Sequence, residues 1–423
     1  MNSYEFLHHN FGIGKNILDK VIEIEEDIIE DIKRIEEISN YNQLKVLKAF
    51  QQNRVSDSHF SGTTGYGYDD LGREVIDKVF ANAFETESAL VRHNIISGTH
   101  AISLCLFAVL RPGDTLLAAT GKPYDTLHQT IMCEGKGSLR DFGINYRQVD
   151  LIHGAVNFNG LKNAIDSSVK AVIIQKSKGY EFRKSLSCAE VEEIIKVIKN
   201  INSSIICIVD NCYGEFVEKK EPNADLLAGS LIKNPGGGLA PTGGYIAGRE
   251  EYVELASYKL NAVGLGRECG ATLGLNRAIL QGLFLAPHIV GQAIKSAIFC
   301  SALCKAFGLE VLPQSNEPRY DIIQAVKFNS THHVIAFCQG IQSGSPVDSF
   351  VTPTPWAMPG YDNEVIMAAG AFTQGASIEL SADAPIREPY VAYVQGGLTY
   401  DSAKVGIILG IENVLNSRDE AIR

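Results

Sequence analysis

The sequence predicts an α/β protein with a mainly parallel sheet, preceded by a helical arm and followed by a smaller α+β section. Three patterns support this expectation. Apolar and acidic residues follow helical spacing over 17–38, short β-branched segments alternate with helical ones from residue 61, and an amphipathic helix near residue 287 opens a second run of strands. A chain of 423 residues is also longer than one core usually holds, which favours two domains.

Residues 1–60 are predicted to form a helical N-terminal arm. Apolar residues recur every three or four positions from Ile17 to Ile38, with acidic residues between them. A second helical stretch runs from Tyr41 to Gln52. Both stretches are typical of an arm that packs elsewhere, for example on a partner subunit.

Residues 61–286 are predicted to form a large three-layer α/β domain. The expected strands are short, apolar and β-branched, as strands buried on both faces are. They are Ala89–Ile96, Thr115–Thr120, Ala171–Gln175 and Ile205–Asp210. Thr99–Leu110 and Ala189–Lys199 have helical periodicity, so the alternation predicts parallel βαβ units.

Residues 287–423 are predicted to form a smaller C-terminal α+β domain. It begins with an amphipathic helix over Ile289–Phe307 and closes with a helix over Asp401–Leu415. The remaining expected elements are a helix over Thr331–Ile341 and strands at Glu310–Leu312, Ile322–Phe328, Ser377–Leu380 and Tyr390–Val394.

Composition and charge restrict the partners of the chain. A net charge of -11 argues against a nucleic-acid or anionic-membrane surface, because both select clustered lysine and arginine. We expect no apolar stretch of the ~20 residues that span a bilayer, and the first ten residues do not resemble a signal peptide. The nine cysteines lack metal-like spacing and are expected as buried thiols in a reducing cytosol. These observations predict a cytoplasmic protein without a metal site.

Two motifs in the predicted large domain suit a phosphorylated aromatic cofactor. Ser97-Gly98-Thr99-His100 lies between a strand and a helix, where glycine allows close approach and free N–H groups at a helix start bind phosphate. Tyr124 follows the next strand, where its ring could stack on a cofactor. Each has an ordinary alternative: many strand-to-helix turns look similar, and Tyr124 could be a core or surface tyrosine.

Asp210 and Lys233 supply the remaining chemistry. Asp210 ends a buried strand, where α/β sheets place their ligands, and its carboxylate could hold a pyridine nitrogen protonated. The alternative is that it caps the following turn through Asn211. Ser230 lies three residues before Lys233, and Pro235-Gly236-Gly237-Gly238 follow. A buried lysine loses its proton readily and can form an imine, the Ser230 hydroxyl can bind phosphate, and the glycines are expected to leave space for a bulky ring.

A lone lysine beside glycines is most often a solvated surface residue. The order of phosphate turn, aromatic residue, strand-end aspartate and lysine is much less common by chance, and it predicts pyridoxal 5′-phosphate (PLP) bound to Lys233 as a Schiff base. Arg387, near the C-terminus, could hold the carboxylate of an amino-acid substrate in a bidentate fork. Its alternative is an ion pair with Glu388 or Asp383.

These residues resemble a known family. Val209-Asp210-Asn211 with Ser230 and Lys233 resembles the fold-type I PLP enzymes of the Cys/Met-metabolism branch, which contains cystathionine β-lyase and methionine γ-lyase. The segments Thr64–Arg73, Ile96–Ala101 and Ser381–Tyr390 are similar to one subgroup, the bacterial aluminium-resistance proteins described as methionine γ-lyase-like. The similarity covers nearly the whole chain and implies an aspartate aminotransferase-like large domain.

The resemblance also implies a role for each site residue. Lys233 is the Schiff-base lysine and general acid/base, Asp210 pairs with the pyridinium, and Tyr124 stacks on the ring. The remaining implied residues are Gly98, Thr99 and Ser230 on the phosphate, Tyr66 or Tyr68 reaching the neighbouring subunit's phosphate, and Arg387 on the substrate carboxylate. The family is also homodimeric or homotetrameric. This chain departs from better-known members at Ile232, where they have threonine, and in the Tyr66-Gly67-Tyr68 segment.

The expected function is therefore a PLP-dependent lyase that eliminates a thiol or related group from the β or γ carbon of a sulfur amino acid. An aminotransferase, an aldolase or a non-catalytic PLP-binding protein would use the same cofactor residues. Ser230-x-x-Lys233 also fits the serine–lysine motif of penicillin-binding proteins, but the sequence lacks the accompanying S-D-N and K-T-G motifs.

Overall fold

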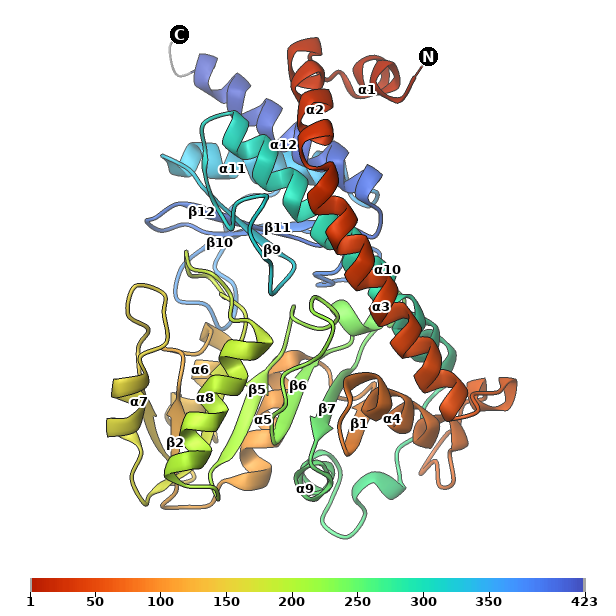
Figure 1. The fold of residues 1–423 in the computed structure, drawn as a ribbon, viewed down its shortest axis with the longest axis vertical. Coiled ribbons are helices and arrows are strands. Elements are labelled where there is room, and N and C mark those ends of the chain that lie inside the picture. The colour runs from red at the N-terminus through yellow and green to blue at the C-terminus, as the bar shows by residue number, and fades with distance from the viewer. Residues whose placement is uncertain (1, 421–423) are drawn as a thin grey trace. The chain divides into compact units, whose positions relative to one another are not determined.

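The structure is a computed structural model that describes residues 2–420 (Figure 1). The chain divides into two compact units. The first, here called the α/β unit, contains Tyr41–Gly179 and Arg183–Pro287. The second, here called the terminal unit, contains the described residues up to Asn40, Tyr180–Phe182 and the chain from His288 onward. The predicted α/β class with a mostly parallel sheet is confirmed.

A seven-stranded sheet forms the centre of the α/β unit, in the order β1-β7-β6-β5-β4-β2-β3. Its strands are β1 Ser88–Arg92, β2 Thr115–Ala118, β3 Asn145–Gln148, β4 Val169–Gln175, β5 Ile206–Asp210, β6 Leu226–Ser230 and β7 Gly244–Gly248. Strands β3, β2, β4, β5 and β6 are parallel, whereas β7 runs antiparallel to both of its neighbours. The carboxyl ends of the parallel strands therefore share one edge of the sheet.

Helices connect the strands of this sheet, and apolar side chains pack between the two. The helices are α4 Leu71–Phe84, α5 Gly98–Val109, α6 Asp125–Met132, α7 Phe158–Ala164, α8 Cys188–Ile201 and α9 Glu250–Leu260, with short 3₁₀ turns at Asp57–Phe60, Asn234–Gly236 and Gly266–Glu268. One buried cluster joins Ile102 and Leu106 of α5 to Ile208 of β5 and Ile246 of β7. Burying each such side chain contributes about 1.5–3 kcal/mol.

The terminal unit has its own five-stranded antiparallel sheet, in the order β10-β11-β12-β9-β8. Its strands are β8 Glu310–Leu312, β9 Ile323–Lys327, β10 Val365–Ala368, β11 Ser381–Pro385 and β12 Val391–Gln395. Helices α11 (Thr331–Ser343) and α12 (Tyr400–Glu420) pack together closely, because a Cβ on Gly340 would lie 2.4 Å from the Leu409 carbonyl oxygen.

The N-terminal helices are α1 (Ser3–Phe11), α2 (Lys15–Asp27) and α3 (Ile29–Gln52). Within the terminal unit, α2 is held to α12 by an ion pair of 2.6 Å between Glu25 and Lys404. The two helical stretches expected in the arm differ from these helices, since α3 continues through residue 40 without a break.

Helix α10 (Asn276–Ala306) is longer than predicted. The expected helix covered Ile289–Phe307, after Pro287, and proline is disfavoured inside a helix because it lacks the backbone N–H. In the structure Pro287 lies inside the helix, which begins 11 residues earlier, at Asn276. The expected strand at Ser377–Leu380 is likewise displaced, to Ser381–Pro385.

Contrary to expectation, α10 is also long and apolar enough to cross a membrane by length and composition alone. About two thirds of its most apolar window, 67%, is buried inside the protein, which is typical of the core helix of a soluble protein. It is the single helix of this kind among residues 2–420.

The glycines after Lys233 pack against backbone rather than leaving space for a ring. A Cβ on Gly236 would lie 1.7 Å from the Leu231 carbonyl oxygen, and one on Gly237 would lie 2.3 Å from the carbonyl oxygen of Gly282 in α10. Gly237 also has a φ of 53°, a conformation that glycine adopts most readily. The lysine loop is therefore seated directly on α10.

Gly282→Ala tests this contact, because a Cβ at residue 282 would lie 2.2 Å from the Gly236 carbonyl oxygen. Alanine raises helix propensity, but we expect the clash to dominate and to lower the free energy of unfolding by about 1–3 kcal/mol in denaturant titrations. Gln281→Ala, an exposed neighbour on the same helix, should change it by less than about 0.5 kcal/mol. Equal stability of the two variants would show that the loop does not rest on α10.

Candidate functional site

Polar side chains gather where three neighbouring strands of the parallel sheet end. Gln175, Asp210 and Ser230 are the last residues of β4, β5 and β6. All three are buried, and Lys233 follows Ser230 on the loop that leads to β7. Ligand sites in α/β proteins lie at this edge of the sheet.

Lys233 is half-buried, and its amine lies 3.9 Å from the centre of the Tyr213 ring. Burial lowers the pKa of this amine, but Cys212, Tyr213 and Asp210 raise it by more, so the free lysine is protonated. Tyr213 adopts a φ of 71°, which is uncommon for a residue with a side chain. Nothing in the sequence indicated Tyr213, because its place over the amine depends on this tight turn.

Asp210 is 4% exposed and lies within the electrostatic reach of Lys233. Burial raises the pKa of its carboxyl, whereas Lys233 and a hydrogen bond from Cys212 lower it by less. The carboxyl accepts the backbone N–H of Cys212 at 3.1 Å, so it does cap the following turn, although through Cys212 rather than Asn211. The other interpretation of Asp210, that its carboxylate holds a pyridine nitrogen protonated, stays a prediction.

The turn before α5 lies directly against the ends of β5 and β6. A Cβ on Gly98 would lie 2.8 Å from the sulfur of Cys212 and 3.8 Å from the Cβ of Ser230. Ser97 caps the helix by accepting the N–H of His100 at 3.1 Å, which leaves the N–H groups of Gly98 and Thr99 without partners inside the helix. The His100 ring accepts a hydrogen bond from the backbone N–H of Ile96 at 3.3 Å, so this ring nitrogen stabilises the turn itself.

Tyr124 joins this group from the start of α6. Its hydroxyl is 2.7 Å from the Thr99 hydroxyl, which is also 3.0 Å from the hydroxyl of Thr126. Its backbone N–H donates to Gln175 at 3.0 Å. Burial raises the pKa of the Tyr124 phenol, and Asp210 raises it further, so the phenol stays protonated. Sequence reasoning missed Gln175 and Thr126, although Gln175 ends a predicted strand just as Asp210 does.

Tyr66 and Tyr68 lie on a separate, exposed loop of the α/β unit. Their rings are 5.6 Å apart and 19° from parallel, with 70% and 57% of each residue exposed. Arg73 holds the loop through hydrogen bonds to the carbonyl oxygens of Gly67 and Gly270. No described contact joins either ring to Lys233.

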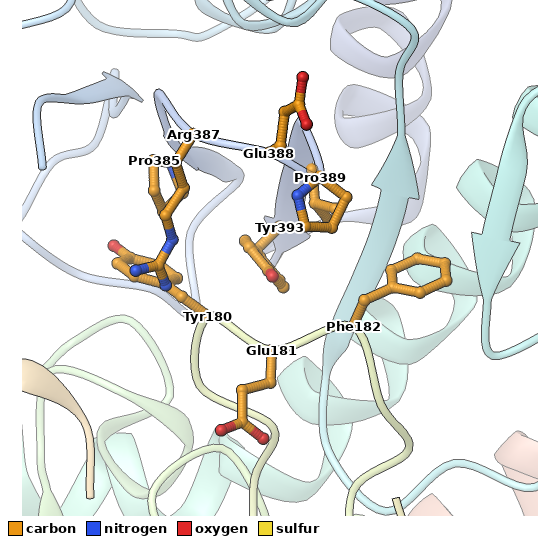
Figure 2. Close-up of a pocket in the computed structure, with 9 residues that line it drawn as sticks. Tyr180, Glu181, Phe182, Pro385, Arg387, Glu388, Pro389 and Tyr393 are labelled. Carbon is orange, nitrogen blue, oxygen red and sulfur yellow. The ribbon is translucent and has the colours of Figure 1, made fainter. Parts of the chain in front are cut away.

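Arg387 belongs to the terminal unit, where it lines a cavity of about 250 Å³. The other lining residues are Tyr180, Glu181, Phe182, Pro385, Glu388, Pro389, Val391 and Tyr393. In Figure 2 the guanidinium points toward Tyr180, whereas the Glu388 carboxylate points away from it. Asp383, one of the two acids considered as its ion-pair partner, accepts hydrogen bonds from the side chains of Tyr180 and Gln395 at 3.4 and 3.0 Å.

Comparison with known proteins identifies the family. The family described as methionine gamma-lyase matches residues 17–415. The chain belongs to this family. It is 50% identical over 412 residues to the uncharacterized protein YnbB of Bacillus subtilis (strain 168), covering 96% of this chain and 98% of that protein.

Two solved structures of related proteins have the same fold. One, from Clostridium acetobutylicum, is named as a candidate cystathionine beta-lyase involved in aluminum resistance, with a TM-score of 0.95, 51% identity and coverage of 98% of this chain and 99% of that one. The other, from Clostridium novyi NT, is named a carbon-sulfur lyase involved in aluminum resistance, with a TM-score of 0.94, 50% identity and the same coverages.

Membership of the methionine γ-lyase family makes this chain an enzyme of the PLP-dependent lyase type, with PLP as its cofactor. The residues around Lys233 fit that group. The helix start at Gly98 and Thr99 has free N–H groups beside the Ser230 strand end, and Asp210 is a buried acid whose facing cation is Lys233. If Lys233 held the cofactor, a protonated ring nitrogen would be a suitable partner for the Asp210 charge. Residues 2–420 contain no cluster of three or more histidine, cysteine or acidic residues that could hold a metal ion.

A double-variant cycle on Gly98 and Cys212 tests the packing of the phosphate turn. Gly98→Ala places a methyl group against the Cys212 sulfur, so we expect it to lower the free energy of unfolding by about 1–3 kcal/mol. In the Gly98→Ala/Cys212→Ala protein the loss should be smaller than the sum of the two single losses, by at least about 0.5 kcal/mol. Purely additive losses would mean that the turn and the β5 end are not in contact.

Proposed function

We propose that this enzyme eliminates a thiol or related group from the β or γ carbon of a sulfur amino acid, with release of ammonia and a keto acid. The observation that supports it most strongly is the grouping of Lys233, Asp210 and Tyr124 at the carboxyl edge of the sheet. The name of the Clostridium novyi relative, a carbon-sulfur lyase, agrees with this reaction type.

Each residue of the group has a defined task in this proposal. PLP, when bound, supplies an electron-poor ring that accepts the electron pair left at the substrate Cα. Lys233 bonds the cofactor in the resting enzyme, and its amine takes the Cα proton once the substrate amine has displaced it. Asp210 keeps a proton on the ring nitrogen, because its buried carboxylate favours a cation there.

The remaining residues are proposed to bind and orient the cofactor. Tyr124 stacks on the ring, with its hydroxyl fixed by Thr99 at 2.7 Å and its backbone by Gln175. The Gly98 and Thr99 N–H groups bind the phosphate, whose dianion suits the positive end of α5. The Ser230 hydroxyl and His100 complete the cofactor residues in the proposal, although the His100 ring is already engaged by Ile96.

Arg387 is proposed to bind the substrate α-carboxylate. Its guanidinium lines a cavity beside Tyr180 and Tyr393. The planar guanidinium of Arg387 can donate two parallel hydrogen bonds, which suits the carboxylate of a bound substrate. The aromatic walls suit the apolar chain of a sulfur amino acid.

We further propose that the enzyme acts in the cytoplasm as a homodimer or homotetramer. The nine cysteines are free thiols and eight of them are buried, which suits a reducing compartment. The exposed, stacked Tyr66 and Tyr68 are the residues proposed to reach a neighbouring subunit.

Supplying a panel of sulfur amino acids to the PLP-loaded enzyme tests the reaction. We expect at least one of them to yield thiol and keto acid in equal amounts, and Asp210→Asn to lower kcat by about 10²-fold or more, because it removes the buried charge that holds the ring proton. Keto acid without thiol would indicate an aminotransferase instead. No turnover, and no exchange of the Cα proton, would indicate a PLP-binding protein without catalysis.

Arg387→Lys tests carboxylate binding separately. Lysine keeps the charge but loses the fork, so kcat/KM should fall by about 10–100-fold, mainly through KM, while the PLP content per chain stays unchanged. Arg249→Lys, at a half-exposed arginine of the α/β unit, is the matched control and should behave as wild type. An unchanged KM would remove Arg387 from the substrate site.

A further inference from the structure

A buried acid, Glu215, lies next to the loop that carries Lys233. Glu215, on the turn that follows β5, is 0% exposed. The Tyr245 hydroxyl on β7 donates to its Oε1 at 2.8 Å, and its backbone carbonyl accepts a hydrogen bond from the side chain of Asn234 at 3.0 Å. Asn234 is the residue directly after Lys233, so the Glu215 turn contacts the lysine loop itself.

Strand β6 has a glycine, Gly229, where any side chain would clash with this acid. A Cβ on Gly229 would lie 2.5 Å from the Glu215 Oε1 and 2.6 Å from Cε1 of Tyr245. Gly229 directly precedes Ser230. The Glu215–Tyr245 pair is therefore seated against the backbone of the strand that leads to the cofactor lysine.

The buried oxygens around Glu215 outnumber the donors left for them, of which Lys176 Nζ, beside Gly214, is one. Three buried oxygens there receive no hydrogen bond among the described residues: Oε2 of Glu215, Oδ1 of Asn211 and Oδ1 of Asn234. Asn211 directly follows Asp210, and Asn234 directly follows Lys233. The side-chain oxygens of both asparagines therefore accept no hydrogen bond in the described structure. An ionised Glu215 only accepts hydrogen bonds, whereas the protonated acid brings one O–H donor to this group.

We propose that Glu215 is a positioning residue held as the neutral carboxylic acid, which joins the turn after Asp210 to the loop that carries Lys233. This inference rests on the proposed function in one respect, because it takes Lys233 as the residue that bonds PLP. Glu215 itself touches neither cofactor nor substrate.

Electrostatics agree with a neutral Glu215 at physiological pH. Burial raises the pKa of its carboxyl to about 8, Glu221 adds to the increase, and the hydrogen bonds that it accepts and Lys233 lower it by less. The titratable groups around it are Tyr245 on β7, Cys212 on its own turn, Glu221 on the loop before β6, Lys176 after β4 and Lys233. Above a pH of about 8, ionised Glu215 adds a buried negative charge near Lys233 and stabilises its protonated amine. An imine requires the unprotonated amine, so ionisation opposes cofactor binding.

Infrared difference spectroscopy of the full-length protein tests the protonation state. Between about pH 6 and about pH 10 the wild type should lose the carbonyl band of a buried, protonated carboxyl. Glu215→Gln should lack that change, because the amide copies the neutral acid and cannot ionise, whereas Asp210→Asn should retain it. A difference spectrum identical in wild type and Glu215→Gln would overturn the proposal.

The dependence of PLP affinity on pH tests the positioning role. From about pH 7 to about pH 9 the Kd for PLP of the wild type should rise relative to that of Glu215→Gln by a factor on the order of ten, and the two should agree at pH 7. Glu193→Gln, at an exposed glutamate of α8, should follow the wild type. Identical pH profiles for wild type and Glu215→Gln would overturn the positioning role. Neither measurement uses turnover, so failure of the lyase assignment would not be mistaken for failure here.

Discussion

The electrostatic interaction between the buried carboxyl of Asp210 and the half-buried amine of Lys233 is the one on which the rest of the site depends. A carboxylate removed from water costs several kcal/mol unless a cation faces it, and Lys233 is the cation in electrostatic reach. The two residues are far apart in the chain, and they meet because β5 and β6 are neighbours in the sheet and end at the same edge. In the proposed function a protonated ring nitrogen would replace the lysine as partner of the carboxylate, so the Asp210 charge would be balanced with and without the cofactor.

Close backbone packing keeps this pair in place. On one side the lysine loop rests on α10 through Gly236, Gly237 and Gly282, where no side chain fits. On the other side Gly98 brings the start of α5 against Cys212. Glu215 lies between Tyr245, which donates to its carboxyl group, and Asn234, which donates to its backbone carbonyl. The residues proposed to hold the cofactor therefore lie at strand and helix ends or, for Lys233, on a loop packed against a helix, an arrangement that suits a fixed catalytic geometry.

Sequence patterns predicted most of the fold and the order of the site motifs. Buried parallel strands are continuous β-branched runs, so β4 and β5 were placed to within two residues, and their ends indicated Asp210. The patterns could not show what depends on contacts between distant segments. The glycines after Lys233 look like open space in a sequence, but they are packed on α10. Pro287 looks like a helix start because its lost N–H is a local property, whereas the helix around it is stabilised by burial. Tyr213 and Glu215 lie in a turn without a recognisable motif.

The most direct test of the account is to locate the cofactor on the chain. Reduction of the PLP-loaded protein with borohydride fixes the cofactor to the lysine that holds it, and peptide mass spectrometry then identifies that residue. We expect one pyridoxyl group per chain, on Lys233. Attachment to Lys176 or Lys178, the fully buried lysines just after β4, would contradict the account and move the site along the same sheet edge.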